Sequence, residues 1–233
     1  MIDHHPVEIY KENLNNSNQR TFVIGDVHGN YDLLLAGLRE NNITENDFLV
    51  FNGDLINKGS ETEKVLDFVL TRPNTLCLYG NHESVFLLLV DDIEKKQLYM
   101  DGMENCTMLQ NYIDEMKAHW LKGKGFNYIK KYADLIKEKF YFAAEFIVGN
   151  EKVGVVHAAV PFADWNMLLK SPVEALWSFS YYNDEKNWEV YNVDKVIHGH
   201  IPVKNIEQQE NVIYIDTGSY YTKDKKLSFI RLV

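Results

Sequence analysis

Cysteine is scarce in this 233-residue sequence, and long apolar runs are missing. The two cysteines, Cys77 and Cys106, provide no disulfide framework, which is consistent with the reducing environment of the cytoplasm. No run of about 18 consecutive apolar residues occurs, so no membrane-spanning helix is expected. Residues 1–20 are polar and lack the basic start and apolar centre of a signal peptide. We therefore expect a cytoplasmic protein.

Basic residues are also in the minority, because 24 Lys and Arg face 34 Asp and Glu and the formal net charge is -10. A surface of this sign repels nucleic acids and anionic lipids, so we expect no nucleic-acid partner and no membrane partner. A phosphate substrate is still possible, since bound metal ions would dominate the field locally. The sequence does not determine the oligomeric state.

Three apolar runs in the first half each precede a segment in which apolar residues recur at helical spacing. Strands separated by helices in this way predict βαβ units with parallel pairing. The predicted strands are 21–24, 48–51 and 75–79, and the predicted helices cover 31–41, 61–71 and 83–95.

The second half is richer in predicted strands, and Gly149-Asn150 between two of them is a hairpin signal. Between the halves, residues 96–139 have a charged, helical pattern that predicts an insertion. We expect an α/β (α+β) fold of two packed sheets flanked by helices, in one domain at 21–233 that follows a polar segment at 1–20. The later strands are predicted at 140–148, 152–157, 193–198, 211–215 and 226–232.

Polar side chains follow five of the predicted strands, at the point where each strand ends. In an open α/β sheet, ligands bind beyond the carboxyl ends of the strands, so these side chains are expected to meet. The strings are Gly25-Asp26-Val27-His28-Gly29, Gly53-Asp54, Gly80-Asn81-His82-Glu83, His157-Ala158 and Gly199-His200.

The residue types in these strings suit a two-metal hydrolytic site. Oxygen and imidazole ligands together favour Mn, Fe or Zn over Ca or Mg. Asp26 and His28 have the same parity after their strand and can face one ion, while the Asp54 carboxylate can bridge two. Singly, each Asp could cap a helix and each His could belong to the core, but five coincident strand ends favour a metal site. His82, next to Asn81, is placed to act as a general acid.

These motifs resemble the phosphoprotein phosphatase family of calcineurin-like metallophosphoesterases, in particular the short bacteriophage-lambda-type serine/threonine phosphatases. The resemblance runs from about residue 21 to residue 231. It implies a four-layer β-sandwich flanked by helices, two divalent metal ions and His82 as the catalytic acid. Manganese is the first expectation for the metal, with iron or zinc as alternatives. The resemblance assigns one ion to Asp26, His28 and Asp54 and the other to Asp54, Asn81, His157 and His200.

The second motif departs from the family pattern, which usually reads Gly-Asp-x-x-Asp-Arg-Gly. Here residues 53–59 read Gly-Asp-Leu-Ile-Asn-Lys-Gly. Asn57 can keep the hydrogen bond to the catalytic histidine but not the charge, so we expect His82 to be less basic than in a typical member. Lys58 replaces an arginine that grips phosphate, and a point charge is not equivalent to a planar, bidentate fork.

Two further arginines of the family pattern are missing. Tyr79 stands where the family often has one, just before Gly80, and residues 177–180 contain none where another is expected. From the positions of these residues in the motifs, we predict His82 and Asn57 as catalytic residues and Lys58 and Tyr79 as substrate contacts.

Three functions remain open from the sequence. The first is a metal-dependent phosphomonoesterase that attacks a phosphoprotein or a small phosphoester with a metal-bridging hydroxide. The second is a hydrolase of dinucleoside polyphosphates or phosphodiesters, which Asn57 favours because related enzymes of that kind lack the Asp of the second motif. The third is a catalytically weak phospho-binding module. A weaker acid favours aryl phosphates, phosphotyrosine or phosphoanhydrides over phosphoserine, because their leaving groups need less proton donation.

Overall fold

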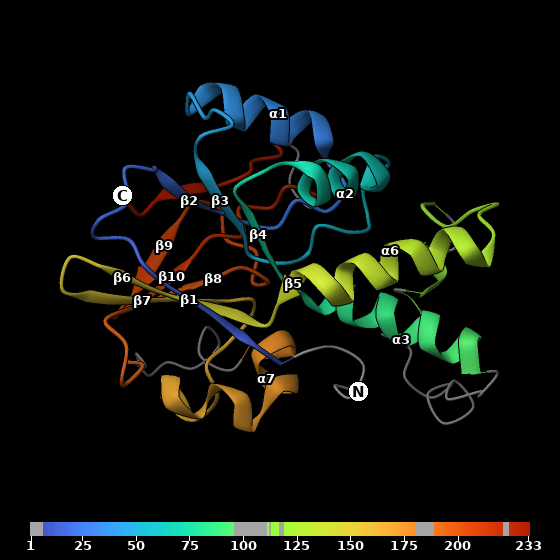
Figure 1. Cartoon of the computed structure of the whole chain (residues 1–233). Coiled ribbons are helices and arrows are strands. Elements are labelled where there is room, and N and C mark those ends of the chain that lie inside the picture. Colours follow the sequence, from blue (N-terminus) through green and yellow to red (C-terminus); the bar gives the residue numbers. More distant parts are fainter. Residues whose placement is uncertain (1–6, 96–110, 112, 117–118, 180–188, 221–223) are drawn as a thin grey trace.

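Two β-sheets pack face to face, and helices lie on the outside of both (Figure 1). The structure is a computed structural model and describes residues 7–95, 111, 113–116, 119–179, 189–220 and 224–233. The sandwich of two sheets flanked by helices confirms the predicted fold class. Within the described residues, one sheet has the strand order β11 (Phe229–Arg231), β2 (Thr21–Ile24), β3 (Phe48–Phe51), β4 (Thr75–Leu78) and β5 (Phe140–Tyr141).

The first sheet consists of the predicted βαβ units. Strands β2, β3, β4 and β5 pair in parallel, and β11 is antiparallel to β2. The register aligns Ile24 with Phe51 and Phe51 with Cys77, so these strands end at one edge of the sheet. The polar loops that follow the strands therefore meet there. The intervening helices α1 (Tyr31–Glu40) and α2 (Thr62–Thr71) cover the outer face of this sheet in Figure 1.

The second sheet brings two further strand ends to the same region. The predicted hairpin at residues 149–150 joins β6 to β7 in antiparallel pairing, and β8 pairs in parallel with β7. His157 and His200 follow β7 and β8, so they leave neighbouring strands. The order of this sheet in the described residues is β1 (Ile9–Asn13), β6 (Ala143–Val148), β7 (Glu151–Val156), β8 (Lys195–His198), β10 (Val212–Tyr214) and β9 (Glu207–Gln209).

Two details differ from the prediction. The single strand expected at 140–148 is divided between the sheets, since β5 ends at Tyr141 in one sheet and β6 begins at Ala143 in the other. Strand β1 was not predicted, and it pairs in parallel with β6 from within the polar segment 1–20. That the chain forms one domain at 21–233 stays a prediction.

Alternating side chains of the first sheet form two cores. Val23, Val50 and Leu78 point between the sheets, where they join Phe146 and Val155 of the second sheet. Their neighbours along the strands, including Ile24, Phe51 and Cys77, belong to the core under the helices. Burial on both faces explains why these strands are apolar throughout rather than alternating.

The outer face of the second sheet is covered by short helices. The last of them, α7, lies below this sheet in Figure 1, and the Trp165 ring of η2 packs against Gly154 of β7. These helices are η1 (Pro161–Ala163), η2 (Trp165–Lys170) and α7 (Pro172–Trp177).

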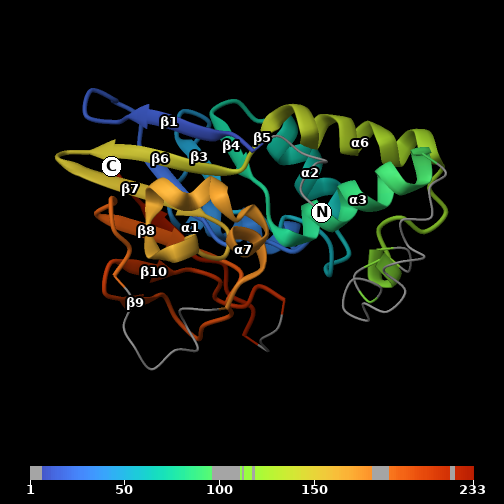
Figure 2. The same ribbon diagram turned by 90° about the horizontal axis from the view of Figure 1, so that it is seen from below.

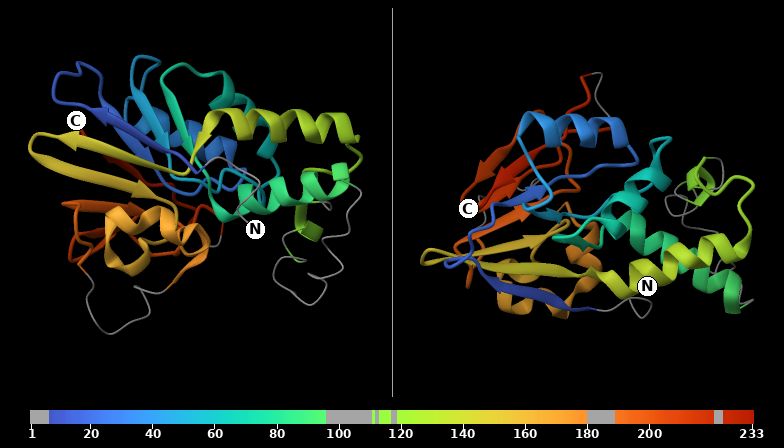
Figure 3. Two further views of the ribbon diagram at one scale, coloured as in Figure 1. Left: turned by 60° about the horizontal axis from the view of Figure 1, so that its bottom comes forward. Right: turned by 45° about the horizontal axis from the view of Figure 1, so that its top comes forward.

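Two longer helices, α3 (Asn81–Lys95) and α6 (Phe126–Lys139), lie side by side at one end of the sandwich (Figures 2 and 3). Helix α6 belongs to the predicted insertion at 96–139, of which residues 96–110, 112 and 117–118 lie outside the described residues. The Trp120 ring packs on Phe86 of α3, with ring centroids 4.7 Å apart. None of the helices in the described residues is long and apolar enough to cross a membrane.

Candidate active site

Three of the predicted ligand residues have a left-handed backbone. The φ angle is 48° at His28, 50° at Asp54 and 61° at His200, and each residue lies in the loop that follows a strand. This conformation is uncommon outside glycine and, where packing imposes it, gathers at functional sites. The three loops therefore mark this edge of the sandwich as the candidate site.

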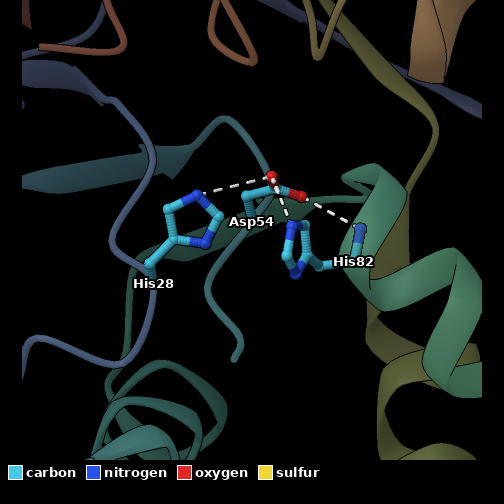
Figure 4. Close-up of side chains that lie close together, drawn as sticks. All are labelled: His28, Asp54 and His82. Atoms are coloured by element: carbon cyan, nitrogen blue, oxygen red, sulfur yellow. Dashed lines mark hydrogen bonds and ion pairs between the residues drawn. The ribbon is translucent and has the colours of Figure 1, made fainter. Parts of the chain in front are cut away.

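His28, Asp54 and His82 form one group of side chains at this edge (Figure 4). Asp54 Oδ2 lies 3.7 Å from His28 Nε2 and 3.8 Å from His82 Nε2. The His82 backbone N–H donates to Asp54 Oδ1 at 3.1 Å. His28 Nδ1 donates to the Ile56 carbonyl oxygen at 3.1 Å, which directs the Nε2 lone pair at Asp54. The ligand atoms of the three residues lie within 4.8 Å of one another, close enough to hold one ion.

A second group shares Asp54 with the first. The ligand atoms of Asp54, His157 and His200 also lie within 4.8 Å of one another. His157 Nδ1 donates to the Asn52 carbonyl oxygen at 2.8 Å, so its Nε2 faces the site, 3.4 Å from Asp54 Oδ1. Asn81 Oδ1 lies 3.0 Å from His157 Nε2 and 3.1 Å from His200 Nδ1. A carboxylate, an amide and two imidazoles thus converge on one space.

Asp26 is buried beside these groups. Among the described residues, neither group of ligand atoms includes it. Its carboxylate oxygens accept the backbone N–H of His200 at 3.1 and 3.3 Å. A Cβ on Gly199 would collide with the Asp26 carboxylate, so the loop after β8 approaches as closely as it does because residue 199 is glycine.

The Glu83 carboxylate holds the loops after β3 and β4 together, a role absent from the sequence predictions. Its Oε2 accepts the backbone N–H groups of Asp54 at 2.9 Å and Gly80 at 2.8 Å, and its Oε1 accepts those of Leu55 at 2.9 Å and Ile56 at 3.2 Å. Burial, with Asp54, raises the pKa of Glu83 to about 8, and these backbone N–H donors oppose the rise. The available signal was a carboxylate directly after two candidate residues at the start of a helix.

Asn57 and Lys58 lie at the site as predicted from their motif. Asn57 Oδ1 contacts His82 Nδ1. Lys58 Nζ lies 3.2 Å from His28 Nε2. Burial lowers the pKa of Lys58, and the carboxylates of Asp54 and Asp26 oppose the decrease. These contacts place an amide on the ring of His82 and an amino group beside the ring of His28.

Tyr79 lies elsewhere. Its side chain is fully buried, and its hydroxyl donates to the Ile136 carbonyl oxygen of α6 at 3.2 Å. The side chain fills the core between β4 and α6, and that Tyr79 contacts substrate stays a prediction. Its apolar ring made burial the better interpretation at the end of an apolar strand.

Burial is the main cause of the low pKa values of the site histidines. It lowers the pKa of His157 to about 4 and lowers those of His28, His82 and His200 well below the usual value. Neighbouring histidines and Lys58 add to the effect on His82. His28, His157 and His200 are therefore neutral at pH 7, which is the form of imidazole that binds metal ions.

The carboxylates shift in the opposite direction. Burial raises the pKa of Asp54 to about 7, with Lys58 opposing the rise. Burial, together with Asp216 and then Asp54, raises the pKa of Asp26. A cation between these groups would favour their ionised forms, because metal binding releases the protons of its ligands.

A cavity of about 120 Å³ opens between these side chains. Phe179, which the sequence reasoning did not single out, contributes a ring that is 46% exposed and whose centroid lies 4.6 Å from that of His200. The cavity is lined by His28, Asp54, Lys58, Asn81, His82, Phe179, His200 and Pro202.

The donor set fits divalent transition metals. Buried imidazole, amide and carboxylate groups match the ligand preferences of Mn, Fe and Zn. The Asn81 amide fits a cation in particular: with Nδ2 turned inward it would donate to both His157 and His200, and with Oδ1 inward its oxygen faces the same space as their lone pairs. Asp54 belongs to both groups of ligand atoms and can bridge two ions.

Comparison with known proteins agrees with this geometry. The model of the family described as calcineurin-like phosphoesterase matches residues 19–204. Serine/threonine-protein phosphatase 2 of Escherichia coli (strain K12) is 27% identical over 219 residues, which cover 91% of this chain and 92% of the relative. The symmetrical bis(5'-nucleosyl)-tetraphosphatase of Salmonella paratyphi B (strain ATCC BAA-1250 / SPB7) is 37% identical over 79 residues, 33% of this chain and 28% of the relative.

A solved serine/threonine phosphatase from Saccharomyces cerevisiae shares the fold, with a TM-score of 0.58 at 16% identity over 98% of this chain and 84% of that chain. The family is dinuclear-metal dependent, in keeping with the two groups of His and Asp ligand atoms. Because the family model spans most of the chain, the protein belongs to the calcineurin-like phosphoesterase family and is a hydrolase that acts on phosphoric esters.

Proposed function

We propose that this hydrolase is a dinuclear-metal-dependent phosphomonoesterase of the phosphoprotein phosphatase type. The observation that carries the proposal is that Asp54 lies close to His28 in one group of ligand atoms and to His157 and His200 in the other, beside a cavity of about 120 Å³. His82 and Lys58 line the same cavity, so a proton donor and a cation face the place where a phosphoryl group would bind. The similarity to a bacterial serine/threonine-protein phosphatase over 91% of the chain supports this reaction class.

The metal ligands are assigned within this proposal. Asp26, His28 and Asp54 would hold one ion, and Asp54, Asn81, His157 and His200 the other. The chemistry supplied by a bound pair of divalent cations is charge neutralisation on the phosphoryl group and a lower pKa for the attacking water. Manganese is the first metal to test, with iron and zinc next.

His82 would serve as the general acid. Its Nδ1 contacts Asn57 Oδ1, and its Nε2 is directed toward Asp54 Oδ2 and the cavity. When the bond between phosphorus and the leaving oxygen breaks, the proton on His82 Nε2 would pass to that oxygen. General acid catalysis of this kind contributes about 10²–10⁴-fold.

The substrate class follows from three side chains at the cavity. Asn57 holds the His82 ring without a negative charge, and Lys58 offers a point charge where a planar guanidinium would grip phosphate in two places. The half-exposed ring of Phe179 beside His200 can pack on an aromatic leaving group. Aryl phosphates, including phosphotyrosine, are therefore proposed as better substrates than phosphoserine. Comparable kcat/KM values on matched phosphoserine and phosphotyrosine peptides would contradict this preference.

A second candidate is the hydrolysis of dinucleoside polyphosphates. The specific observation is the 79-residue segment that is 37% identical to a symmetrical bis(5'-nucleosyl)-tetraphosphatase, together with Asn57 in the second motif. The nucleoside phosphate released from a phosphoanhydride is a good leaving group. Its release needs little proton donation, so the uncharged partner of His82 would suffice. Phe179 would then face a base or a ribose.

The test is the hydrolysis of p-nitrophenyl phosphate and bis-p-nitrophenyl phosphate, with and without Mn²⁺, by the unaltered protein and the His82→Ala variant. Mn-dependent cleavage of the monoester is the expected result, and on phenyl phosphate, whose poorer leaving group needs the acid, the variant should lose at least about 100-fold. His119→Ala is the matched control, because His119 is exposed. Cleavage mainly of the diester would favour the nucleotide-directed function, which parallel assays with diadenosine tetraphosphate would then measure. Binding of phosphate without turnover of any substrate would overturn the proposal.

A further inference from the structure

Asn57 introduces an ambiguity that an aspartate would not have. A carboxylate presents equivalent oxygens, but an amide presents an oxygen that accepts and a nitrogen that donates. The histidine form that gives up a proton carries N–H on both ring nitrogens, so its Nδ1–H needs an acceptor. If Nδ2 of Asn57 faced the ring, two donors would oppose each other inside the protein. Asn57 is only 2% exposed, so water has little access to correct the mismatch.

A carboxylate from a distant part of the chain removes this ambiguity. Asn57 Nδ2 donates to Glu115 Oε2 at 3.2 Å, while Asn57 Oδ1 contacts His82 Nδ1. A carboxylate accepts hydrogen bonds and has none to donate, so the end of the amide that faces Glu115 must be its nitrogen. The oxygen is thereby directed at the ring.

The backbone around Glu115 is anchored by its neighbours. Ile113 and Met116 lie on either side of it in the chain and are 4% and 0% exposed. The backbone N–H of Leu121 donates to the Met116 carbonyl oxygen at 2.8 Å, and Trp120, next to it in the chain, packs on Phe86 of α3. Trp120, four residues after Met116, thus lies against the same helix whose first turn carries His82.

We infer that Glu115 is a positioning residue for His82, acting through the orientation of the Asn57 amide. The inference rests on the proposed function, in which His82 donates the proton to the leaving oxygen. With Asn57 Oδ1 on Nδ1–H, the ring is held with Nε2 toward the cavity. The segment that supplies Glu115 belongs to the predicted insertion at 96–139, so that insertion takes part in the acid chemistry of the site.

The test compares two monoesters that differ in leaving group. Phenolate is a poor leaving group, so the hydrolysis of phenyl phosphate depends on the general acid. p-Nitrophenolate is a good leaving group, so the hydrolysis of p-nitrophenyl phosphate depends on the acid little. In the full-length protein with Mn²⁺, Glu115→Ala is expected to lower kcat about tenfold on phenyl phosphate and less than about twofold on p-nitrophenyl phosphate, with KM unchanged on both. Glu115→Gln can still accept from Asn57 Nδ2 through its amide oxygen, and is expected to restore most of the lost kcat. Asp114→Ala is the control, because Asp114 is the exposed neighbour of Glu115.

A second pair of variants separates positioning from a general loss of structure. In an Asn57→Asp background there is no amide to orient, so adding Glu115→Ala should leave the ratio of kcat on the two substrates unchanged. Equal losses of kcat on the two substrates would overturn the inference. So would a change in the ratio of the two kcat values that Glu115→Ala causes to the same extent with and without Asn57→Asp. The His82→Ala variant shows whether a negative result contradicts this inference alone or the proposed function as well. If it shows the leaving-group dependence and Glu115→Ala does not, the inference alone fails, and if His82→Ala shows none, the acid role of His82 in the proposed function fails with it.

Discussion

Gly80 is a position where one added methyl group should damage the site. It lies between β4 and Asn81, and its backbone N–H donates to Glu83 Oε2 at 2.8 Å. A Cβ at this position would collide with Asp54, the nearest atoms being its Oδ1 and its backbone nitrogen, with Cγ at 2.9 Å. Asp54 belongs to both groups of ligand atoms, so a Gly80→Ala substitution acts on both proposed metal positions through one added methyl group.

The expected size of the Gly80→Ala effect depends on how little the atoms of Asp54 next to Gly80 can move. Both the backbone and the carboxylate of Asp54 are in the way, and its carboxylate is tied to the His82 N–H at 3.1 Å while its own N–H is held by Glu83 at 2.9 Å. Inserting a methyl group into a well-packed interior costs about 1–3 kcal/mol of unfolding free energy. A displacement of about 1 Å at a catalytic group costs about 100-fold in rate. We therefore expect Gly80→Ala to fold and to lose about 100-fold in Mn-dependent kcat/KM.

The assay pairs urea unfolding with Mn²⁺ titration of p-nitrophenyl phosphatase activity. Gly125→Ala is the matched control, since a Cβ there meets nothing within 4 Å and the residue precedes α6. The control should keep its activity and its unfolding free energy to within about 0.5 kcal/mol. Activity of Gly80→Ala within threefold of the unaltered protein would refute the reasoning, because the loops after β3 and β4 could then separate without consequence.

Three further predictions concern pH, metal and substrate. The Arg20 guanidinium, donating to Asp47 at 2.6 and 2.8 Å, lowers the pKa of Asp47 to about 2 from 3.8. A lowered carboxyl pKa gives stability above the unfolded value that is lost as pH falls toward 2, so Asp47→Asn should cost about 2 kcal/mol of unfolding free energy at pH 6 and much less at pH 2. Urea titrations at both pH values measure this, and a difference independent of pH would contradict it. Treatment with a chelator should abolish phosphatase activity, which added Mn²⁺ restores; activity that persists in the chelator, after verified metal removal, would contradict metal dependence. Phe179→Ala should raise KM about fivefold for p-nitrophenyl phosphate and leave inhibition by inorganic phosphate unchanged, and equal changes in both would argue against ring packing.

The first sheet and the edge that carries the site were predictable because their signals are local. An apolar run of four residues shortly before Asp-x-His or Asn-His predicts both a strand and the candidate ligand residues in the loop after it. The parallel register of β2, β3 and β4 then brings the strand ends together without further information. The backbone is left-handed at His28 and Asp54, and the adjacent Gly29 and Gly53 also have positive φ angles.

Strand β1 and the division of residues 140–148 depend on tertiary structure instead. Strand β1 reads Ile-Tyr-Lys-Glu-Asn and lies at the edge of its sheet, where polar side chains are tolerated and no apolar run is needed. The stretch at 140–148 is uniformly strand-like, and only the packing of two sheets decides that the chain changes sheet between Tyr141 and Ala143. No local pattern distinguishes a continuous strand from this crossing.

The departure at Asn57 shows the limit of reading a site from one motif. Taken alone, an Asn in place of the usual Asp indicates a weaker partner for His82. Asn57 Nδ2 donates to Glu115 Oε2, so a carboxylate contacts the far end of the amide from His82. Glu115 comes 58 positions after Asn57 in the chain. The amide can then hold the ring in one orientation and transmit the direction of a hydrogen bond, though not the full charge. A motif and an insertion thus form one functional unit, and a substitution in either one should be judged by the leaving group that the site has to protonate.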